Sequence, residues 1–150
     1  MTTVSRRCGV IAVLIHISLM ASGCSRSRRP ELPKTFPVTG VVSIEGKPLP
    51  GATVMFNPAG GDGHGSIALT DTAGRYKLTT FKPGDGVVPG DYKVAITKIE
   101  LGGSGSDSPV AVAPDPKNVL PARYADDSTS GFKATVEAKP DNAFDFTLTK

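Results

Sequence analysis

The residues able to do nucleophilic or metal chemistry are few, and most of them lie at one end of the chain. Cys8, His16 and Cys24 all precede residue 25, and the remaining histidine, His64, stands in the glycine-rich stretch 61–65. A Ser-His-Asp arrangement would have to use His64, and nothing in the sequence places a hydroxyl beside it. We therefore expect no catalytic residue, no metal site and no cofactor.

Loop residues offer only weak signals for a bound ion or nucleotide. Four acids in turns could supply oxygen ligands to calcium, but no spacing is that of an EF-hand loop, and we interpret them as solvated turn residues: Asp62, Asp126, Asp127 and Asp141. The stretch 58–66 lacks the Lys-Ser/Thr ending and the following helix of a phosphate loop.

Carbohydrate binding usually relies on an exposed aromatic side chain. Tyr76 and Tyr92 fall on positions that we expect to point inward, which leaves Tyr124 as the free aromatic candidate. We name Tyr124 and His64 as candidate ligand contacts.

The first 23 residues have the pattern of an export signal. Arg6 and Arg7 precede the apolar run 8–20, and the small residues Ala21, Ser22 and Gly23 follow it. The run is shorter than the ~20 apolar residues of a spanning helix, so we expect it to be cleaved. The sequence leaves open whether the general or the twin-arginine export route is used.

The segment from Leu19 to Cys24 resembles the lipobox of bacterial lipoproteins, although Ala21 stands where leucine is usual. The resemblance implies cleavage between Gly23 and Cys24 and acylation of the Cys24 thiol, which attaches the chain to a membrane. The alternative is a plain secretory signal that leaves Cys24 unpaired. If the cell has two membranes, Ser25 resembles the residue that permits sorting to the outer membrane.

Residues 24–37 are expected to be a lipidated cysteine followed by a tether. The tether contains three prolines, and its arginines suit either anionic lipid headgroups or simple solubility: Arg26, Arg28 and Arg29. Six of the 17 basic residues but one of the 14 acidic residues precede Phe36, so the net charge of +3 belongs to the N-terminal segment. The remainder is slightly acidic, which argues against nucleic-acid binding.

Residues 38–150 are predicted to form one all-β domain. Short stretches of alternating apolar and polar residues predict seven antiparallel strands, near residues 38–44, 52–56, 67–69, 76–80, 92–96, 132–136 and 144–148. Gly (17) and Pro (13) make up a fifth of the chain and mark the turns between them. We expect two facing sheets in a Greek-key sandwich, with a long flexible loop at 100–131 in which 119–124 packs on the core.

Three spaced motifs resemble those of carboxypeptidase regulatory-like domains, which share the transthyretin-like (prealbumin) sandwich. They lie at 38–54, 70–76 and 89–94. The ending, 120–148, resembles that of a bacterial lipoprotein group that carries this domain alone behind a lipobox. The resemblance implies architecture and no catalytic residues.

Two kinds of enzyme share the related sandwich, and each would need residues that this chain lacks. Hydroxyisourate hydrolases use several histidines and a C-terminal Tyr-Arg-Gly-Ser, whereas this chain ends Thr-Leu-Thr-Lys. Intradiol dioxygenases hold iron with two tyrosines and two histidines, whereas only His64 remains as a histidine once the signal is cleaved. The resemblance therefore implies a protein that is not an enzyme.

We expect a lipid-anchored, non-enzymatic β-sandwich of the cell envelope that serves as a structural or protein-interaction module. Its partners would be the membrane, through the lipid, and an envelope protein or glycan, with the chain itself a monomer. The alternative is an accessory lipoprotein that binds a glycan or peptide through the loops 58–66 and 100–131.

Overall fold

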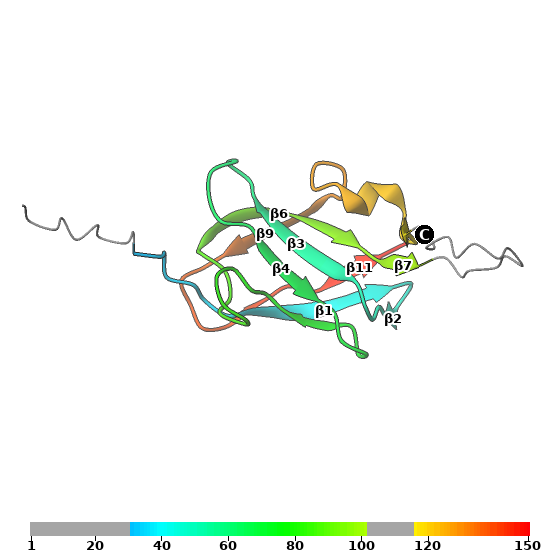
Figure 1. Ribbon diagram of the computed structural model, residues 1–150, viewed down its shortest axis with the longest axis horizontal. Helices are drawn as coiled ribbons and strands as arrows, with labels where there is room; N and C mark the ends of the chain where they lie inside the picture. The colour runs from blue at the N-terminus through cyan, green and yellow to red at the C-terminus, as the bar shows by residue number, and fades with distance from the viewer. Residues whose placement is uncertain (1–30, 102–115) are drawn as a thin grey trace, which may run out of the picture. The chain divides into compact units, whose positions relative to one another are not determined.

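The structure, a computed structural model, describes residues 31–101 and 116–150 (Figure 1). In these ranges the chain is all-β, as predicted, and its sheets are mostly antiparallel. The strands, in chain order, are β1 (Val38–Ile44), β2 (Lys47–Pro48), β3 (Thr53–Pro58), β4 (Ser66–Leu69), β5 (Arg75–Lys77), β6 (Gly90–Thr97), β7 (Ile99–Leu101), β8 (Pro116–Asn118), β9 (Phe132–Val136), β10 (Asn142–Ala143) and β11 (Phe146–Leu148). A single-turn 3₁₀ helix, η1, spans Ala122–Ala125.

The first sheet is built around β1. Strands β10 and β11 pair with β1 in parallel on one side, and β2 and β5 pair with it in antiparallel on the other. The parallel pairing corrects the expectation of antiparallel strands throughout. It arises because the chain returns to β1 from the opposite sheet, so β11 enters at the same end as β1 does.

The second sheet has the order β4-β3-β6-β9 and is antiparallel. Ile67 of β4 exchanges two backbone hydrogen bonds of 3.0 Å with Thr79, which follows β5, so one edge of this sheet is joined to the segment after β5. Beyond β6 the chain continues as β7, which pairs only with β8 in a two-stranded ribbon.

Both sheets contribute to one hydrophobic core. Phe56 of β3 is fully buried, and its ring centroid lies 5.8 Å from that of Tyr92, 6.0 Å from Phe144 and 6.1 Å from Phe146. Tyr76 and Tyr92 point inward as predicted, each about 4% exposed. Because burial of each large apolar side chain stabilises the fold by about 1.5–3 kcal/mol, this aromatic cluster is a principal source of stability.

Aspartate side chains hold two turns through hydrogen bonds from backbone amides. The carboxylate of Asp71 accepts hydrogen bonds from the amides of Ala73 and Arg75, while Gly74 takes a φ of +71°. Asp85 accepts hydrogen bonds from the amides of Thr80, Phe81 and Lys82.

All seven predicted strand segments contain a strand, namely β1, β3, β4, β5, β6, β9 and β11. The short strands β2, β7, β8 and β10 were not predicted because two or three residues carry too little alternation to detect. The predicted loop 100–131 contains β8 and η1, and its residues 102–115 lie outside the described residues. Within the predicted packed segment 119–124, Leu120 and Tyr124 are buried but Val119 is 45% exposed.

The facing of β4 was predicted wrongly. Its alternation suggested that Ile67 and Leu69 point into the core, but they are 52% and 67% exposed, while Ser66 and Ala68 are 5% and 8% exposed. Two polar contacts of inward side chains set this register. Ser66 Oγ lies 2.6 Å from Thr80 Oγ1, and Thr70 Oγ1 donates a 2.6 Å hydrogen bond to the Leu49 carbonyl.

Candidate functional site

Tyr124 is not the exposed aromatic platform that the sequence suggested. It lies on η1, is 5% exposed, and its ring stacks on that of Phe132 with centroids 5.5 Å apart and planes 10° from parallel. The 3₁₀ turn places the ring against the end of β9, so the side chain is part of the core. A ligand cannot stack on a ring that is covered in this way.

The hydroxyl of Tyr124 is nevertheless in an unusual electrostatic setting. It accepts a 3.0 Å hydrogen bond from the Thr149 amide and another from the Arg123 guanidinium, which also binds the Thr149 carbonyl at 2.7 Å. Hydrogen bonds from Thr149 are the main cause that lowers the pKa of Tyr124 to about 8, and Arg123 adds to them. Since one donor belongs to Thr149 and the other, Arg123, also binds Thr149, this cluster fastens the residues after β11 to η1 and is not a ligand site.

His64 lies at the edge of a shallow groove of about 580 Å³. The groove is formed by the loop after β3 and the segment that leads into β6, with Asp62, His64, Asp91 and Tyr92 among its lining residues. The His64 ring meets Phe81 edge-on with centroids 4.8 Å apart. Thr135 donates a 2.7 Å hydrogen bond to Asp91 Oδ1, which orients that carboxylate at the rim.

The four turn acids are not gathered in one place. Asp127 accepts a 2.9 Å hydrogen bond from Asn57, and Asp126 accepts a hydrogen bond from the Ser128 amide. Asp62 lines the groove. Within residues 31–101 and 116–150 no three His, Cys, Asp or Glu side chains are placed to hold a metal ion.

A second surface feature was missed by the sequence reading. Large apolar side chains are exposed on the outer side of the second sheet and on the ribbon that continues it, and we call this surface the apolar face: Ile67, Leu69, Ile99 and Leu101, with the half-buried Met55 between them. Leu101 and Leu69 are 72% and 67% exposed. One sequence signal could have revealed the apolar face. Ser66, Ala68 and Thr70 alternate with Ile67 and Leu69, and small or hydroxyl side chains can occupy the buried side of a strand.

Strand register places these side chains on one continuous surface. Met55 is directly opposite Ile67, and Thr53 is opposite both Leu69 and Thr97. Ile99 and Leu101 follow Thr97 at two-residue intervals, so they point to the same side. Asn118 and Pro116 lie opposite Ile99 and Leu101 on the same side, and the other outward side chains in these rows are apolar or threonine, so none of them carries a charge.

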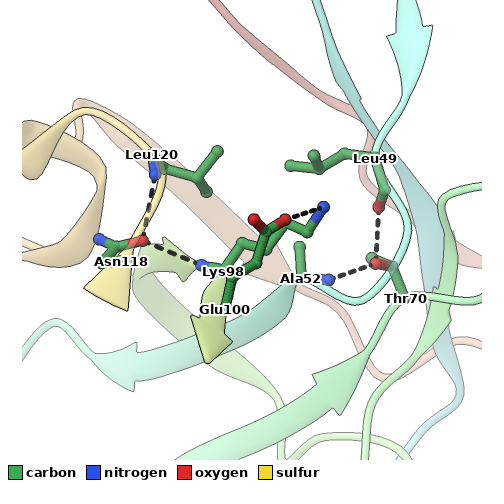
Figure 2. A network of polar contacts seen from close by, with 7 residues as sticks. All are labelled: Leu49, Ala52, Thr70, Lys98, Glu100, Asn118 and Leu120. Atoms are coloured by element: carbon green, nitrogen blue, oxygen red, sulfur yellow. Dashed lines mark hydrogen bonds and ion pairs between the residues drawn. The ribbon is translucent and has the colours of Figure 1, made fainter. Parts of the chain in front are cut away.

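Polar contacts fasten the ribbon to the chain segments next to it, as Figure 2 shows. Asn118 Oδ1 accepts hydrogen bonds from the amides of Lys98 and Leu120, at 3.1 and 3.2 Å. Lys98 and Glu100 form a 3.0 Å ion pair on the side where Leu49 and Leu120 lie. Because this side is fixed, the ribbon must turn Ile99 and Leu101 away from the core.

The fold covers only a part of this outer surface. Ser130 Oγ binds the Val94 carbonyl and Asn57 binds Asp127, so the segment 126–130 lies over the β6 side. Ala95 there is only 2% exposed. The β4 side and the ribbon stay uncovered among the described residues.

The start of β1 and the ribbon lie at different ends of the unit 33–150. Phe36 pairs with Val87 beside the start of β1, and Val38 pairs with Asn142. At the other end of β1, Ile44 pairs with Leu148, near the C-terminus. In Figure 1 the segment before β1 lies at the left, and β7 and the C-terminus lie at the right.

The predicted signal peptide, its cleavage position at Gly23, and Cys24 lie outside the described residues, as do the tether arginines. In the ranges that the structure does describe, no helix has the length and apolar character that a bilayer crossing requires.

Comparison with known proteins does not identify a family for this chain. No family model matches the chain, and no curated protein sequence matches it. Among solved structures it is similar to a 9R-lipoxygenase from Cyanothece PCC8801, with 14% sequence identity and a TM-score of 0.37. The aligned region is 78% of this chain but 16% of the lipoxygenase, so the chain spans about a sixth of that protein. At this TM-score the likeness indicates neither fold nor activity.

Proposed function

We propose that this chain is a lipid-anchored, non-enzymatic β-sandwich of the bacterial cell envelope, related to carboxypeptidase regulatory-like domains, that serves as a protein-interaction module. The signal 1–23 is cleaved, Cys24 carries the lipid, and the domain is displayed on the exported side of the membrane. In a cell with two membranes this is the outer membrane.

The connections between strands support a Greek-key sandwich with seven principal strands. The chain passes from β1 in the first sheet to β3 and β4 in the second, and then to β5 in the first. It returns to the second sheet for β6 and β9 and ends in the first with β11. Connections that cross between two sheets around one core are typical of such sandwiches.

The observation that carries the interaction role is the facing of β4. This strand turns Ile67 and Leu69 to the solvent and buries Ser66, the reverse of what hydrophobic burial favours in an isolated domain. Together with Ile99 and Leu101 these side chains form a patch of the kind that marks a contact surface. A partner that covers the apolar face removes the cost of that exposure.

The use of the polar side chains supports a non-enzymatic role. Thr70 and Asn142 are buried and bind backbone groups of neighbouring loops. Asp85 likewise binds three amides of its own turn. Such side chains stabilise loops and do not converge on a cavity.

Metabolic labelling with a fatty-acid analogue tests the anchor. We expect the parent chain to label and to pellet with membranes, and Cys24→Ala to lose both properties. Cys8→Ala is the matched control, because Cys8 leaves with the signal, and it should label like the parent. Equal labelling of Cys24→Ala and the parent contradicts the lipoprotein proposal.

Crosslinking in intact cells tests the interaction role. An amine-reactive crosslinker should give adducts of the parent that disappear when Ile67 and Leu69 are both replaced by serine. A variant with Thr147→Ser, on the other sheet, should keep them. Adducts that do not respond to the serine changes would place the contact elsewhere and overturn the role of the apolar face.

A second candidate function is capture of a glycan or peptide in the groove at His64, supported by the exposed rim acids Asp62 and Asp91. A glycan and peptide array should then show binding that His64→Ala with Asp91→Asn removes and that Asp141→Asn preserves. An array without such binding excludes this candidate. Tyr124 of loop 100–131 is buried and therefore is not part of this candidate site.

A further inference from the structure

We propose that the apolar face is occupied by a second copy of this chain, so that two domains pack sheet to sheet through β4, β3, β6 and β7. This inference rests on the proposed interaction role and names its partner. It replaces the monomer that the sequence led us to expect.

The chemistry of the face favours a like partner. Its exposed large side chains, Ile67, Leu69, Ile99 and Leu101, surround the threonines Thr53 and Thr97, which carry no charge. A two-fold interface brings identical patches together, so a charged residue near its centre would lie next to the same charge of the other copy. A patch without charges is free of this repulsion, whereas it offers nothing to an acidic headgroup or a basic peptide.

The geometry also suits two facing sheets. Outer faces of twisted sheets pack about 10 Å apart with their strands roughly aligned. Thr53 lies in the middle of the face, between Leu69 and Thr97 in its own row, with Met55 and Ile67 in the next row and Ile99 and Leu101 beyond. Thr53 is therefore the position nearest to its own counterpart in such a pair.

The extent of the face sets the expected strength of the pair. A stable interface buries about 800 Å² from each partner, which requires the threonines and Met55 as well as the exposed aliphatic side chains. We therefore expect association that is weak in dilute solution. It would be favoured where lipid anchors confine the domains to one membrane plane.

The segment 126–130 limits where the copy can sit. It covers Ala95 through the contacts of Ser130 with Val94 and of Asp127 with Asn57. The second copy must therefore approach over β4 and the ribbon, away from η1. This leaves Tyr124 and the C-terminal contacts undisturbed.

Cysteine crosslinking tests the proposal in the full chain within membranes. Thr53→Cys with a short bis-maleimide of about 10 Å span should give an adduct of twice the chain's mass. Thr147→Cys is the matched control, since it introduces the same change on an exposed strand position of the other sheet. Leu69→Asp or Leu101→Asp, added to Thr53→Cys, should reduce the adduct roughly tenfold by burying an unpaired charge.

The outcomes separate this proposal from the proposed function. An adduct of Thr53→Cys with a protein of another mass overturns the second copy but keeps the interaction module. No adduct, or equal adducts at Thr53 and Thr147, overturns the pairing. A doubled-mass adduct in the parent without an introduced cysteine reveals a free Cys24 thiol and contradicts the lipid anchor.

Both aspartate variants should fold, because Leu69 and Leu101 are largely exposed in the single chain. Thermal unfolding of each purified variant provides the check. If the variants melt like the parent and the adduct persists undiminished, the apolar face is not the contact surface and the proposal is wrong.

Discussion

The hydroxyl of Tyr76 donates a 2.6 Å hydrogen bond to the carbonyl of Phe144, which joins β5 to the segment before β11 across the width of β1. Gly40 of β1 lies beneath this bond, and a Cβ there would be 1.8 Å from the Phe144 oxygen and 2.8 Å from the Tyr76 hydroxyl. Burial raises the pKa of Tyr76, with the nearby charge of Asp145 as a further cause. The Tyr76 hydroxyl therefore stays protonated and continues to donate this hydrogen bond.

Gly40→Ala is predicted to destabilise the domain by about 1–3 kcal/mol, because the added methyl group forces the Phe144 carbonyl and Tyr76 apart. Urea unfolding measures the loss. Gly60→Ala is the matched control, since a Cβ at Gly60 meets nothing within 4 Å. Equal stability of the two variants would contradict this account of the β5–β1 packing.

Thr70→Val should cost about 1–3 kcal/mol, although it preserves shape, because it leaves two buried backbone groups without a partner. The Thr70 hydroxyl accepts a 2.8 Å hydrogen bond from the Ala52 amide and donates to the Leu49 carbonyl (Figure 2). Thr72→Val, in the exposed turn that follows, is the control and should have little effect. If Thr70→Val unfolds at the same urea concentration as the parent, this hydroxyl does not fix the facing of β4.

Tyr124 is predicted to ionise separately from the other two tyrosines. Its pKa of about 8 reflects hydrogen bonds from Thr149 and Arg123, while burial raises the pKa of both Tyr76 and Tyr92. An ultraviolet absorbance titration should show one third of the tyrosinate signal near pH 8. In Tyr124→Phe this phase should be absent.

The same depressed pKa predicts how stability depends on pH. The folded Tyr124 releases its proton before the unfolded one, so its contribution increases as the pH rises above about 8 and is complete above the ordinary value of 10.0. The stability of the parent relative to Tyr124→Phe should therefore grow between these values. A constant or shrinking difference would contradict the assignment.

Asp85 is predicted to make the fold sensitive to acid. Burial works to raise its pKa, but hydrogen bonds from the amides of Thr80, Phe81 and Lys82 outweigh this and hold it below the ordinary value of 3.8. Since the folded pKa is depressed, the stabilisation is complete above pH 3.8 and is lost as the pH falls further. Asp85→Asn should cost about 1 kcal/mol at neutral pH.

Unfolding of the parent and Asp85→Asn at several pH values measures this effect. The difference between them should shrink as the pH falls through the acid range. Asp141→Asn, an exposed acid in another turn, is the control and should follow the parent. A difference that stays constant with pH would show that Asp85 acts through shape and not through charge.

The class of fold and most strand positions could be predicted from the amino-acid sequence. Alternation and turn residues located β1, β3, β6 and β9, of which β3 and β9 bury every second residue against the core. The turn at Asp71 depends on local contacts as well, since its carboxylate accepts hydrogen bonds from the amides two and four residues later. Local interactions of this kind can be derived without knowing what lies across the sheet.

Which candidate residues face solvent depends on contacts between distant parts of the chain and could not be predicted. Tyr124 is buried because Phe132, eight positions later in the chain, comes to lie beneath its ring. Ile67 and Leu69 are exposed because Ser66 and Thr70 find partners in Thr80 and Leu49. A shift of one residue in strand register exchanges the two sides of a strand, and distant hydrogen-bond partners set that register. Alternation reveals the period of a strand, but only the packing of the sheets determines which side forms the apolar face.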